Sequence, residues 1–359
     1  MTVERPPTIA DDMLARLSAS PDVYPHKIDL SSLMVLLVRF GPEAYRQASF
    51  LDDRILTPAT EGAWASIDSV ADALSKGVDV RPVSFIFHTG HVGSTLVSRL
   101  LDEGGAVLSL REPLPLRSLA EAHDTLGRAD ALLSREAFDR NLVLLMRLWG
   151  RGYPATRSVV IKATSSAGRL APTLLSANEG SRAIYLNLRA EPYLATLLAG
   201  QNSPADLRGH GPERMRRLQS RVGHPPAPLH SLSIGELAAM SWLVESWSQR
   251  DALNRFPDRV IAFDFDRFLA AVGPGIGRVL GHFGLPADAR HLEGLARSPV
   301  LTRYSKAPEY AYSPEVRGEL LRESRRRNSD EIRRGLAWLE RLAKSDDAAA
   351  EIVEAAESS

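Results

Sequence analysis

The segment from Val83 to Leu96 reads VSFIFHTGHVGSTL, and it decides the fold. It begins with a short run of β-branched and aromatic residues after Pro82, which predicts a buried strand. A turn that contains two glycines follows, and Leu96, Leu100 and Leu101 then recur at helical spacing. A strand, a glycine turn and a helix in this order form a unit of an α/β fold, in which the turn is suited to hold an anion.

Four more apolar runs follow this unit and alternate with segments of helical periodicity. The further strands are predicted at 106–110, 158–161, 183–186 and 259–263, and the main helices at 131–148, 234–254 and 275–283. Continuous apolar runs are typical of parallel strands that are covered on both faces. The sequence therefore predicts an α/β, P-loop three-layer fold with a central, mostly parallel sheet flanked by helices.

The N-terminal part of the chain lies outside this pattern. Asp29 or Ser31 is suited to cap a helix over residues 33–37, and the Gly-Pro pair that follows would end it. Residues 1–80 are therefore predicted to form a helical N-terminal extension that packs on the main domain.

The remaining boundaries follow from composition. The main domain is expected to span residues 81–345. Within it, residues 201–232 are rich in Pro, Gly, His and Arg, which predicts a mobile lid or an irregular loop. Residues 346–359 are predicted to be a frayed tail.

The overall composition excludes several classes of protein. Lys plus Arg and Asp plus Glu both number 44, and the formal net charge of zero is a poor match to a general nucleic-acid binder. The chain has no cysteine, which excludes disulfides, thiolate catalysis and Cys-based zinc sites. His88 and His91 lack an evident third ligand, so no metal is expected. No apolar run approaches the length of a membrane span and the start does not read as a secretory signal, so a cytoplasmic protein is expected.

The turn after the first strand carries the chemistry. Its glycines allow several backbone N–H groups to converge on one anion, and the following helix adds partial positive charge at its N-terminus. Ser94 and Thr95 offer hydroxyls beside these amides. A Walker A sequence would place a lysine after the last glycine, whereas Ser94 follows Gly93 here. Kinase or ATPase chemistry of the ordinary kind is therefore a weaker interpretation.

This segment resembles the 5′-phosphosulfate loop of P-loop sulfotransferases, the enzymes that use 3′-phosphoadenosine 5′-phosphosulfate. Their pattern is a basic residue, a small residue, Gly and two hydroxyl residues. The matching positions, with Gly90 before them, are His91, Val92, Gly93, Ser94 and Thr95. A histidine in the basic place binds anions well only when it is protonated, so donor binding is expected to depend on pH.

The resemblance extends over about residues 82–320 and implies roles for other strand ends. Glu112, after the second strand, is the candidate base that takes a proton from the acceptor. Lys162, at the end of the third strand, and His91 would stabilise the leaving phosphate. The fifth strand and the helix that ends in FGLP resemble a segment of the family with a packing role.

The resemblance also implies a site for the 3′-phosphate of the donor. Arg189, after the fourth strand, would bind this phosphate, and Thr196 is the nearest hydroxyl on the helix that follows. Arg303 and Lys306 lie where the family has a basic loop that closes over the nucleotide.

The sequence therefore predicts a sulfotransferase that moves a sulfuryl group from 3′-phosphoadenosine 5′-phosphosulfate to a hydroxyl or an amine. The acceptor stays open among small metabolites, glycans, lipids and peptides, as does the oligomeric state. Two alternatives stay open as well. One is a nucleotide-dependent phosphotransferase that uses the same turn with Mg²⁺, and the other is a non-catalytic nucleotide-binding protein with the same fold.

Overall fold

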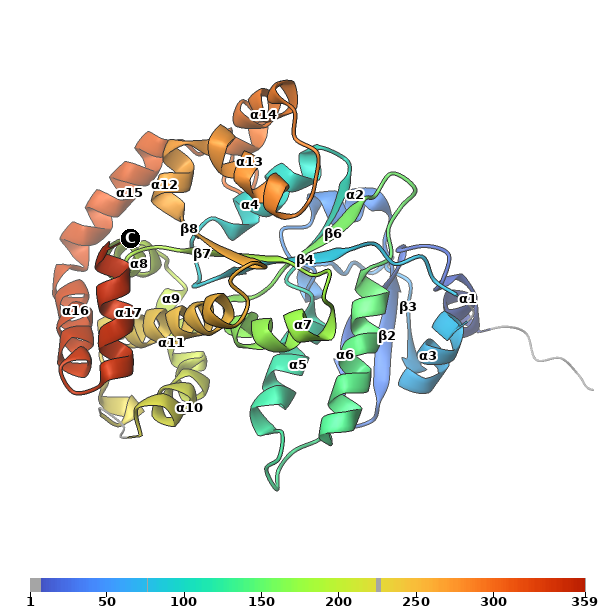
Figure 1. Cartoon of the computed structure of the whole chain (residues 1–359), viewed down its shortest axis with the longest axis horizontal. Coiled ribbons are helices and arrows are strands. Elements are labelled where there is room, and N and C mark those ends of the chain that lie inside the picture. Colours follow the sequence, from blue (N-terminus) through green and yellow to red (C-terminus); the bar gives the residue numbers. More distant parts are fainter. Residues whose placement is uncertain (1–7, 76, 224–226, 359) are drawn as a thin grey trace, which may run out of the picture.

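A computed structural model of the chain describes residues 8–75, 77–223 and 227–358. A parallel sheet of five strands forms its centre, and helices cover both faces (Figure 1). The strands are β4 (Val83–His88), β5 (Val107–Arg111), β6 (Ser158–Lys162), β7 (Ala183–Asn187) and β8 (Val260–Asp264). Their order is β5-β6-β4-β7-β8, and each neighbouring pair is parallel. All five predicted strands and the three-layer α/β fold are thus confirmed.

Different sets of helices cover the two faces of the parallel sheet. On one face of the sheet lie α4 (Ser94–Glu103), α12 (Phe265–Ala270), α13 (Val272–His282) and α14 (Ala289–Ala296). On the other face lie α5 (Leu114–Thr125), α6 (Arg135–Trp149), α7 (Ala171–Ala177) and α11 (Ile234–Arg255). The predicted helices at 131–148, 234–254 and 275–283 correspond to α6, α11 and α13.

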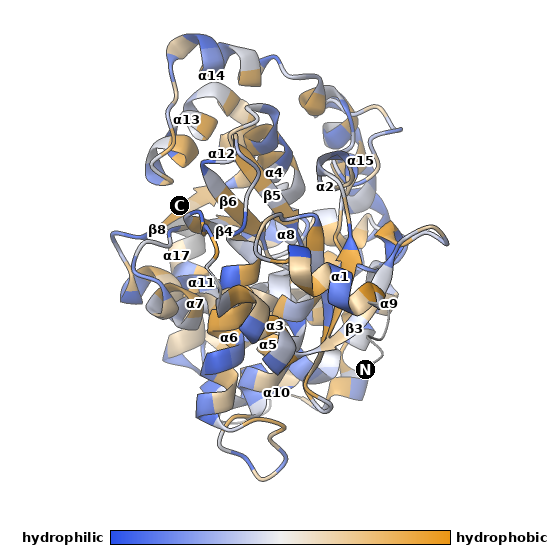
Figure 2. Ribbon diagram, turned by 90° about the vertical axis from the view of Figure 1, so that its right-hand side faces the viewer, coloured by the Kyte–Doolittle hydropathy of each residue, from blue (hydrophilic) through white to orange (hydrophobic). Residues whose placement is uncertain are grey.

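The alternation of side chains along β4 divides the core into two clusters. Phe85 and Phe87 belong to the cluster that includes α5, α6 and α7. Ile86 points the opposite way and belongs to the cluster that includes α4 and α13. The central strands β4 and β6 are accordingly hydrophobic, while the surrounding helices carry both kinds of residue (Figure 2).

The N-terminal extension contains helices, but the prediction of a helix over residues 33–37 is wrong. Residues 34–37 of that segment lie in β2 (Met34–Arg39), the central strand of an antiparallel sheet with β1 (Val23–Asp29) and β3 (Gly62–Ser66). Where this region is described, its α-helices are α1 (Ile9–Arg16), α2 (Pro42–Gln47) and α3 (Ile67–Ser75), and it also contains the short 3₁₀ helix η1 (Asp53–Ile55). Residues 1–7 and 76 of the predicted extension lie outside the described residues.

Asp29 does accept hydrogen bonds as a cap would, but it closes a turn. Its carboxylate accepts from the N–H groups of Ser31 and Ser32, and Leu33 adopts a left-handed φ of 53° that leads into β2. The strands β1 and β3 lie on either side of the apolar run, and pairing with them as a strand gives its backbone groups hydrogen-bond partners.

The predicted lid and the predicted frayed tail are both helical. Residues 201–232 contain α9 (Ser203–Gly209), α10 (Gly211–Val222) and the short 3₁₀ helix η3 (Leu229–Ser231). Residues 224–226 of the predicted lid lie outside the described residues, as does residue 359 of the predicted tail. The prediction of fraying is wrong for the rest of the tail, since α17 (Asp347–Ser358) packs on α11 and α16 (Ser329–Ala343).

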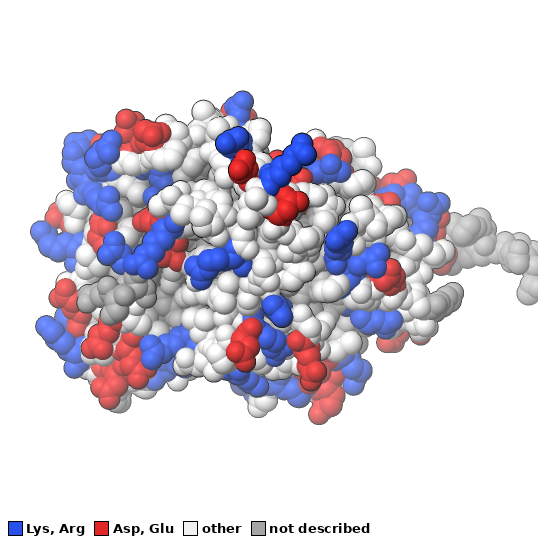
Figure 3. All heavy atoms as spheres, turned by 45° about the horizontal axis from the view of Figure 1, so that its top comes forward, with Lys and Arg blue, Asp and Glu red and all other residues white. Residues whose placement is uncertain are grey.

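Two further features of the structure concern the charge of the surface and the hydropathy of the helices. On the face drawn in Figure 3, acidic and basic side chains are interspersed. No helix in the described residues is long and apolar enough to cross a bilayer.

Candidate functional site

The parallel sheet brings the predicted site segments to one edge, where all five strands end. The glycine turn follows β4, Glu112 follows β5, and Lys162 is the last residue of β6. Arg189 lies at the start of α8 (Ala190–Leu198) after β7, and Phe265 follows β8. This edge is where ligands bind in sheets of this kind.

The turn after β4 is held open by its own backbone conformation. Gly90, His91 and Gly93 all have a left-handed φ, at 106°, 54° and 70°. The N–H of Gly90 donates to Nδ1 of His88 at 3.0 Å, and Nε2 of His88 donates to the carbonyl oxygen of Ala163 at 2.9 Å. His88 therefore fixes the entrance of the turn to the end of β6.

The remaining amides of the turn are free. Among the described residues, the N–H groups of residues 91–96 have no hydrogen-bond acceptor. The Thr95 hydroxyl is also buried without a partner. These donors gather at the N-terminus of α4, where the helix dipole adds positive charge. Free amides at a glycine turn form a site for an anion such as phosphate.

The free amides line a cavity of about 420 Å³, which we name the turn cavity. It is lined by residues from the turn and the start of α4, the end of α8, the start of α12 and the segment 304–320: His91, Val92, Gly93, Ser94, Thr95, Leu96, Thr196, Ala199, Gly200, Phe265, Tyr304, Ser305, Lys306, Tyr310, Ala311, Tyr312, Val316, Arg317 and Leu320. The cavity is thus lined by both backbone donors and aromatic rings.

The aromatic wall of the turn cavity was missed in the sequence. A Cβ atom at Gly93 would lie only 1.9 Å from the Phe265 ring, so that ring packs directly on the turn. Arg317 stands 5.5 Å from the centre of the same ring and pairs with Asp266 at 2.7 Å. The segment 304–312 adds Tyr304, Tyr310 and Tyr312 to the wall. The recurrence of tyrosines beside basic residues in this segment is the sequence signal that could have predicted the wall.

A second cavity of about 460 Å³, which we name the charged cavity, adjoins the turn cavity. Its lining residues are Phe50, Arg54, His88, Gly90, His91, Glu112, Arg117, Thr164, Ser165, Ser166, Gly200, Gln201, Asn202, Ser203, Asp206, His210, Arg214, Tyr304 and Lys306. Four of these residues line both cavities, namely His91, Gly200, Tyr304 and Lys306. The two cavities therefore meet at these four residues, and a ligand in either cavity can contact them.

Glu112 and Lys162 form an ion pair between the ends of β5 and β6. The N–H of Glu112 also donates to the carbonyl oxygen of Lys162 at 2.7 Å, and Glu112 has a left-handed φ of 57°. Burial lowers the pKa of Lys162, and the Glu112 carboxylate opposes this shift. Glu112 lines the charged cavity, whereas Lys162 is 1% exposed and lies behind it. Lys162 therefore orients the carboxylate and does not itself form part of the wall.

The electrostatics of the shared wall differ from the expectation of a cationic histidine. Burial, reinforced by Lys306, lowers the pKa of His91 to about 3, so the imidazole is neutral near pH 7. Burial and the nearby Lys162 lower the pKa of Lys306 to about 8. Lys306, and not His91, is thus the group that supplies positive charge at the junction and titrates near neutral pH.

The structure brings some of the other predicted residues to the turn cavity and leaves others outside. Thr196 lines it, although its hydroxyl donates to the carbonyl oxygen of Pro192 at 2.7 Å. Arg189 is exposed and lines neither cavity. Arg303 is also exposed and lines neither cavity, and its backbone pairs with that of Ala311.

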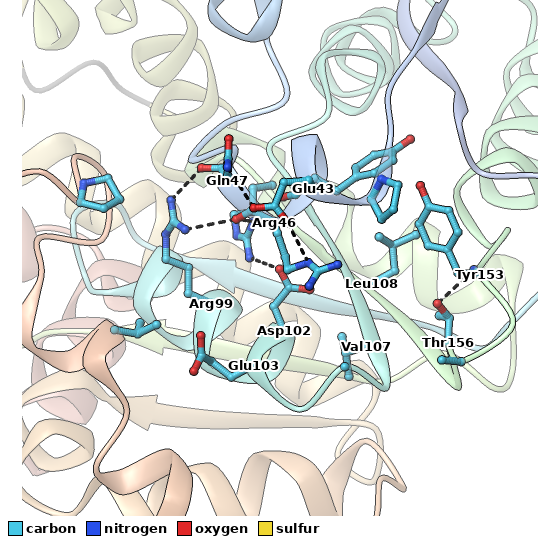
Figure 4. A pocket seen from close by; sticks show the side chains of 17 residues that line it. Glu43, Arg46, Gln47, Arg99, Asp102, Glu103, Val107, Leu108, Tyr153 and Thr156 are labelled. Atoms are coloured by element: carbon cyan, nitrogen blue, oxygen red, sulfur yellow. Dashed lines mark hydrogen bonds and ion pairs between the residues drawn. The ribbon is translucent and has the colours of Figure 1, made fainter.

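A third, larger cavity of about 700 Å³ lies beside β5, away from the turn (Figure 4). Its charged groups are paired: Arg111 contacts Asp102 at 2.8 Å, and Arg99 donates to the carbonyl oxygens of Gln47 and Ser305. Arg99 thereby ties α4 to the residue next to Lys306. The buried cations of this cavity have partners, which distinguishes it from the charged cavity.

Strand order, glycine turn and free amides together define an α/β protein with a P-loop-type turn at the carboxyl edge of its sheet. No group of three or more His, Asp or Glu residues suited to hold a metal is found in the described part of the chain.

Comparison with known proteins gives structural similarity alone. No protein-family model and no curated protein matches the chain. It is similar to a crystal structure of mouse sulfotransferase SULT7A1 complexed with PAP, at 9% identity and a TM-score of 0.40, over 79% of this chain and 93% of that chain. It is similar to sulfotransferase STF9 from Mycobacterium avium, at 12% identity and a TM-score of 0.39, over 90% and 97% of the two chains. The sulfotransferase domain from the curacin biosynthetic pathway has 16% identity and a TM-score of 0.37, over 65% and 84%.

Proposed function

We propose that this protein is a sulfotransferase that uses 3′-phosphoadenosine 5′-phosphosulfate and transfers the sulfuryl group to a hydroxyl or an amine. The observation that carries the proposal is the row of free amides at residues 91–96, which lines a cavity that meets a second cavity at His91 and Lys306. A donor in one cavity and an acceptor in the other would meet at the shared wall.

The turn cavity suits the donor nucleotide. The amides of residues 91–96 and the Thr95 hydroxyl would hold its 5′-phosphosulfate, with Gly90 shaping the turn. Phe265 and the tyrosines of segment 304–312 offer flat surfaces for an adenine ring. Arg189, Thr196 and Arg303 stay the proposed contacts of the 3′-phosphate, although only Thr196 of the three lines the turn cavity, and Arg317 adds a cation on the cavity wall itself.

The reaction needs a base and a cation at the junction. The donor supplies an electrophilic sulfur, and the acceptor atom forms a bond to it while the bond to the bridging phosphate oxygen breaks. Glu112 lines the charged cavity and would accept the proton of the acceptor, and Lys162 would hold the carboxylate in position. Lys306 would neutralise the charge that develops on the leaving phosphate, and His91 would donate a hydrogen bond from its neutral ring.

A titration distinguishes this proposal from its two alternatives. Isothermal titration calorimetry with 3′,5′-ADP in the absence of magnesium should show binding, and ATP with Mg²⁺ should bind more weakly. A preference for ATP with Mg²⁺ would favour a phosphotransferase, and the absence of binding by either nucleotide would contradict a nucleotide-dependent enzyme.

The substitution Lys162→Ala tests the role of the ion pair. Loss of Lys162 leaves Glu112 without its orienting partner, so we expect turnover to fall by about 100-fold or more. The affinity for 3′,5′-ADP should change by less than about threefold, because Lys162 lines neither cavity. Lys344→Ala is the matched control, because Lys344 is exposed and lies at the C-terminal end of α16. Turnover equal to that of the control would remove Lys162 from the mechanism.

A further inference from the structure

Two arginines of the charged cavity have neither a side-chain partner among the described residues nor a role in the proposed transfer. Its other cations have partners or a role at the junction. Lys162 behind the wall pairs with Glu112, and Arg54 pairs with Asp52. Arg117 on α5 and Arg214 on α10 are different, because neither makes a hydrogen bond or ion pair through its side chain within the described residues.

Arg214 is the stronger observation. Arg214 is only 8% exposed, and its Nε atom is buried without a hydrogen-bond partner. Nε of Arg117 is buried and unpartnered as well. A buried guanidinium without a counterion is costly, so such a group is kept where a ligand supplies the missing charge and acceptors.

The two arginines act on the same part of the cavity. His210 lies on the wall between α9 and α10, and after burial Arg214 and Arg117 are the largest causes that lower its pKa. Among the described residues that line the cavity, the carboxylates are Glu112, which is paired, and Asp206, which is exposed. Among the described residues that line the cavity, Arg and Lys side chains therefore outnumber the carboxylates, and neither carboxylate pairs with Arg117 or Arg214.

These arginines belong to the acceptor side. Arg117 and Arg214 line the charged cavity but not the turn cavity, whereas His91 and Lys306 line both. Glu112 lines the same cavity as the arginines, so an acceptor held by them could present its hydroxyl or amine to that carboxylate. The neighbouring side chains are short and polar: Thr164, Ser165, Ser166, Gln201, Asn202 and Ser203.

We propose that the acceptor carries an anionic group, a carboxylate, phosphate or sulfate, which Arg117 and Arg214 bind through charge-assisted hydrogen bonds. This inference rests on the proposed function, because the ligand is an acceptor only if the protein is a transferase. The anion site itself is inferred from the two arginines alone. A polar wall of this kind fits a hydrophilic anionic molecule and does not fit an uncharged lipid.

The test uses the full chain saturated with 3′,5′-ADP, so that the turn cavity is filled. Inorganic phosphate, sulfate and acetate are then titrated by calorimetry against the wild type, Arg117→Gln and Arg214→Gln. Arg216→Gln, an exposed arginine on α10, is the matched control. We expect at least one of the three anions to bind, and its affinity to fall by about tenfold or more in each of the two variants but not in the control. The anion that binds most tightly identifies the group on the acceptor.

Two further readouts separate the outcomes. The affinity for 3′,5′-ADP should be unchanged in Arg214→Gln, and its thermal midpoint should be equal to or higher than that of the wild type, because an unpaired buried charge has been removed. Equal loss of anion and 3′,5′-ADP binding would place Arg214 in the donor site and overturn the inference, as would anion binding that is lost only in Lys306→Gln. Arginine-dependent anion binding without any 3′,5′-ADP binding would refute the proposed function and leave the anion site standing. Binding of 3′,5′-ADP without arginine-dependent anion binding would refute the anion site and leave the proposed function standing.

Discussion

Gly93 and Gly105 have nearly the same left-handed backbone, with φ of 70° and 69°, but their surroundings differ. A Cβ atom at Gly93 would penetrate the Phe265 ring, whereas nothing lies within 4 Å of such an atom at Gly105. The pair separates two costs of a side chain, the backbone strain that both positions share and the steric clash at the turn alone.

Gly105→Ala should lower the free energy of unfolding by about 1–2 kcal/mol, from backbone strain alone. Gly93→Ala should lower it by a further 1–3 kcal/mol, because the Phe265 ring must move, and should also abolish 3′,5′-ADP binding. Urea denaturation and calorimetry measure the two effects. Intact nucleotide binding in Gly93→Ala would contradict the assignment of the turn as the phosphate site.

Lys306 predicts a pH dependence of nucleotide binding. Its pKa of about 8 means that it is largely charged at pH 7 and loses its proton above pH 8. The affinity for 3′,5′-ADP should therefore be steady below this pH and should weaken above it, by at most about tenfold per pH unit. Calorimetry between about pH 7 and about pH 9.5 measures the change.

The control for this prediction is Lys306→Arg, since arginine keeps its charge over that range. Its binding should be nearly independent of pH. The same decline in wild type and Lys306→Arg would show that another group titrates, with Lys162 the next candidate because its pKa is also lowered.

At the scale of elements, α17 shows how tertiary contacts turn an apparently weak segment into a packed helix. Ala349 is fully buried and Ile352 is 4% exposed. The indole N–H of Trp247 on α11 donates to the carbonyl oxygen of Ala348 at 3.0 Å. The helix therefore covers a strip of α11 that would otherwise contact water.

Ile352→Ala should lower the free energy of unfolding by about 2–4 kcal/mol through lost burial and the cavity left behind. Glu351→Ala is the control at the adjacent position, where an ion pair with Arg250 is largely exposed and its loss should cost less than about 1 kcal/mol. Chemical denaturation of both variants compares them. Equal stability of the two would mean that the helix does not pack in solution.

At the scale of the whole molecule, buried histidines make the fold sensitive to acid. Burial is the largest cause that lowers the pKa of His26, His88, His123, His210 and His282. In each case the folded pKa lies below the unfolded value of 6.5, so the unfolded chain takes up protons that the folded chain does not. Stability should therefore fall as the pH drops below 6.5.

His88 should account for a separable part of this loss, because its pKa lies well below 6.5. Its share should be about 1 kcal/mol between about pH 6.5 and about pH 5.5. His88→Gln keeps a donor and an acceptor but does not titrate, so its unfolding free energy should decline less over that interval by this amount. Denaturation at the two pH values, with His230→Gln as an exposed control, measures the difference. An unchanged slope in His88→Gln would contradict a buried neutral His88.

Much of the fold was open to prediction from the sequence because the decisive signals are local. The five central strands are continuous apolar runs, and the glycine turn joins one of them directly to a helix. By contrast, β2 was misread as a helix, since its conformation depends on pairing with β1 and β3. The helices of 201–232 were missed because their polar side chains form ion pairs with distant residues, as Arg217 does with Glu245.

The sequence by itself determined the three-layer α/β fold, the glycine turn that leads into a helix and the position of Glu112 and Lys162 at strand ends. Each of these follows from residues that are neighbours in the chain or from the common edge of parallel strands. Only the tertiary structure decided that Lys162 stands behind Glu112, that His91 is neutral, and that Arg117 and Arg214 share a cavity without carboxylate partners. The physical reason is that burial and Coulomb interactions depend on distances in space, which residues far apart in the chain acquire only when it folds.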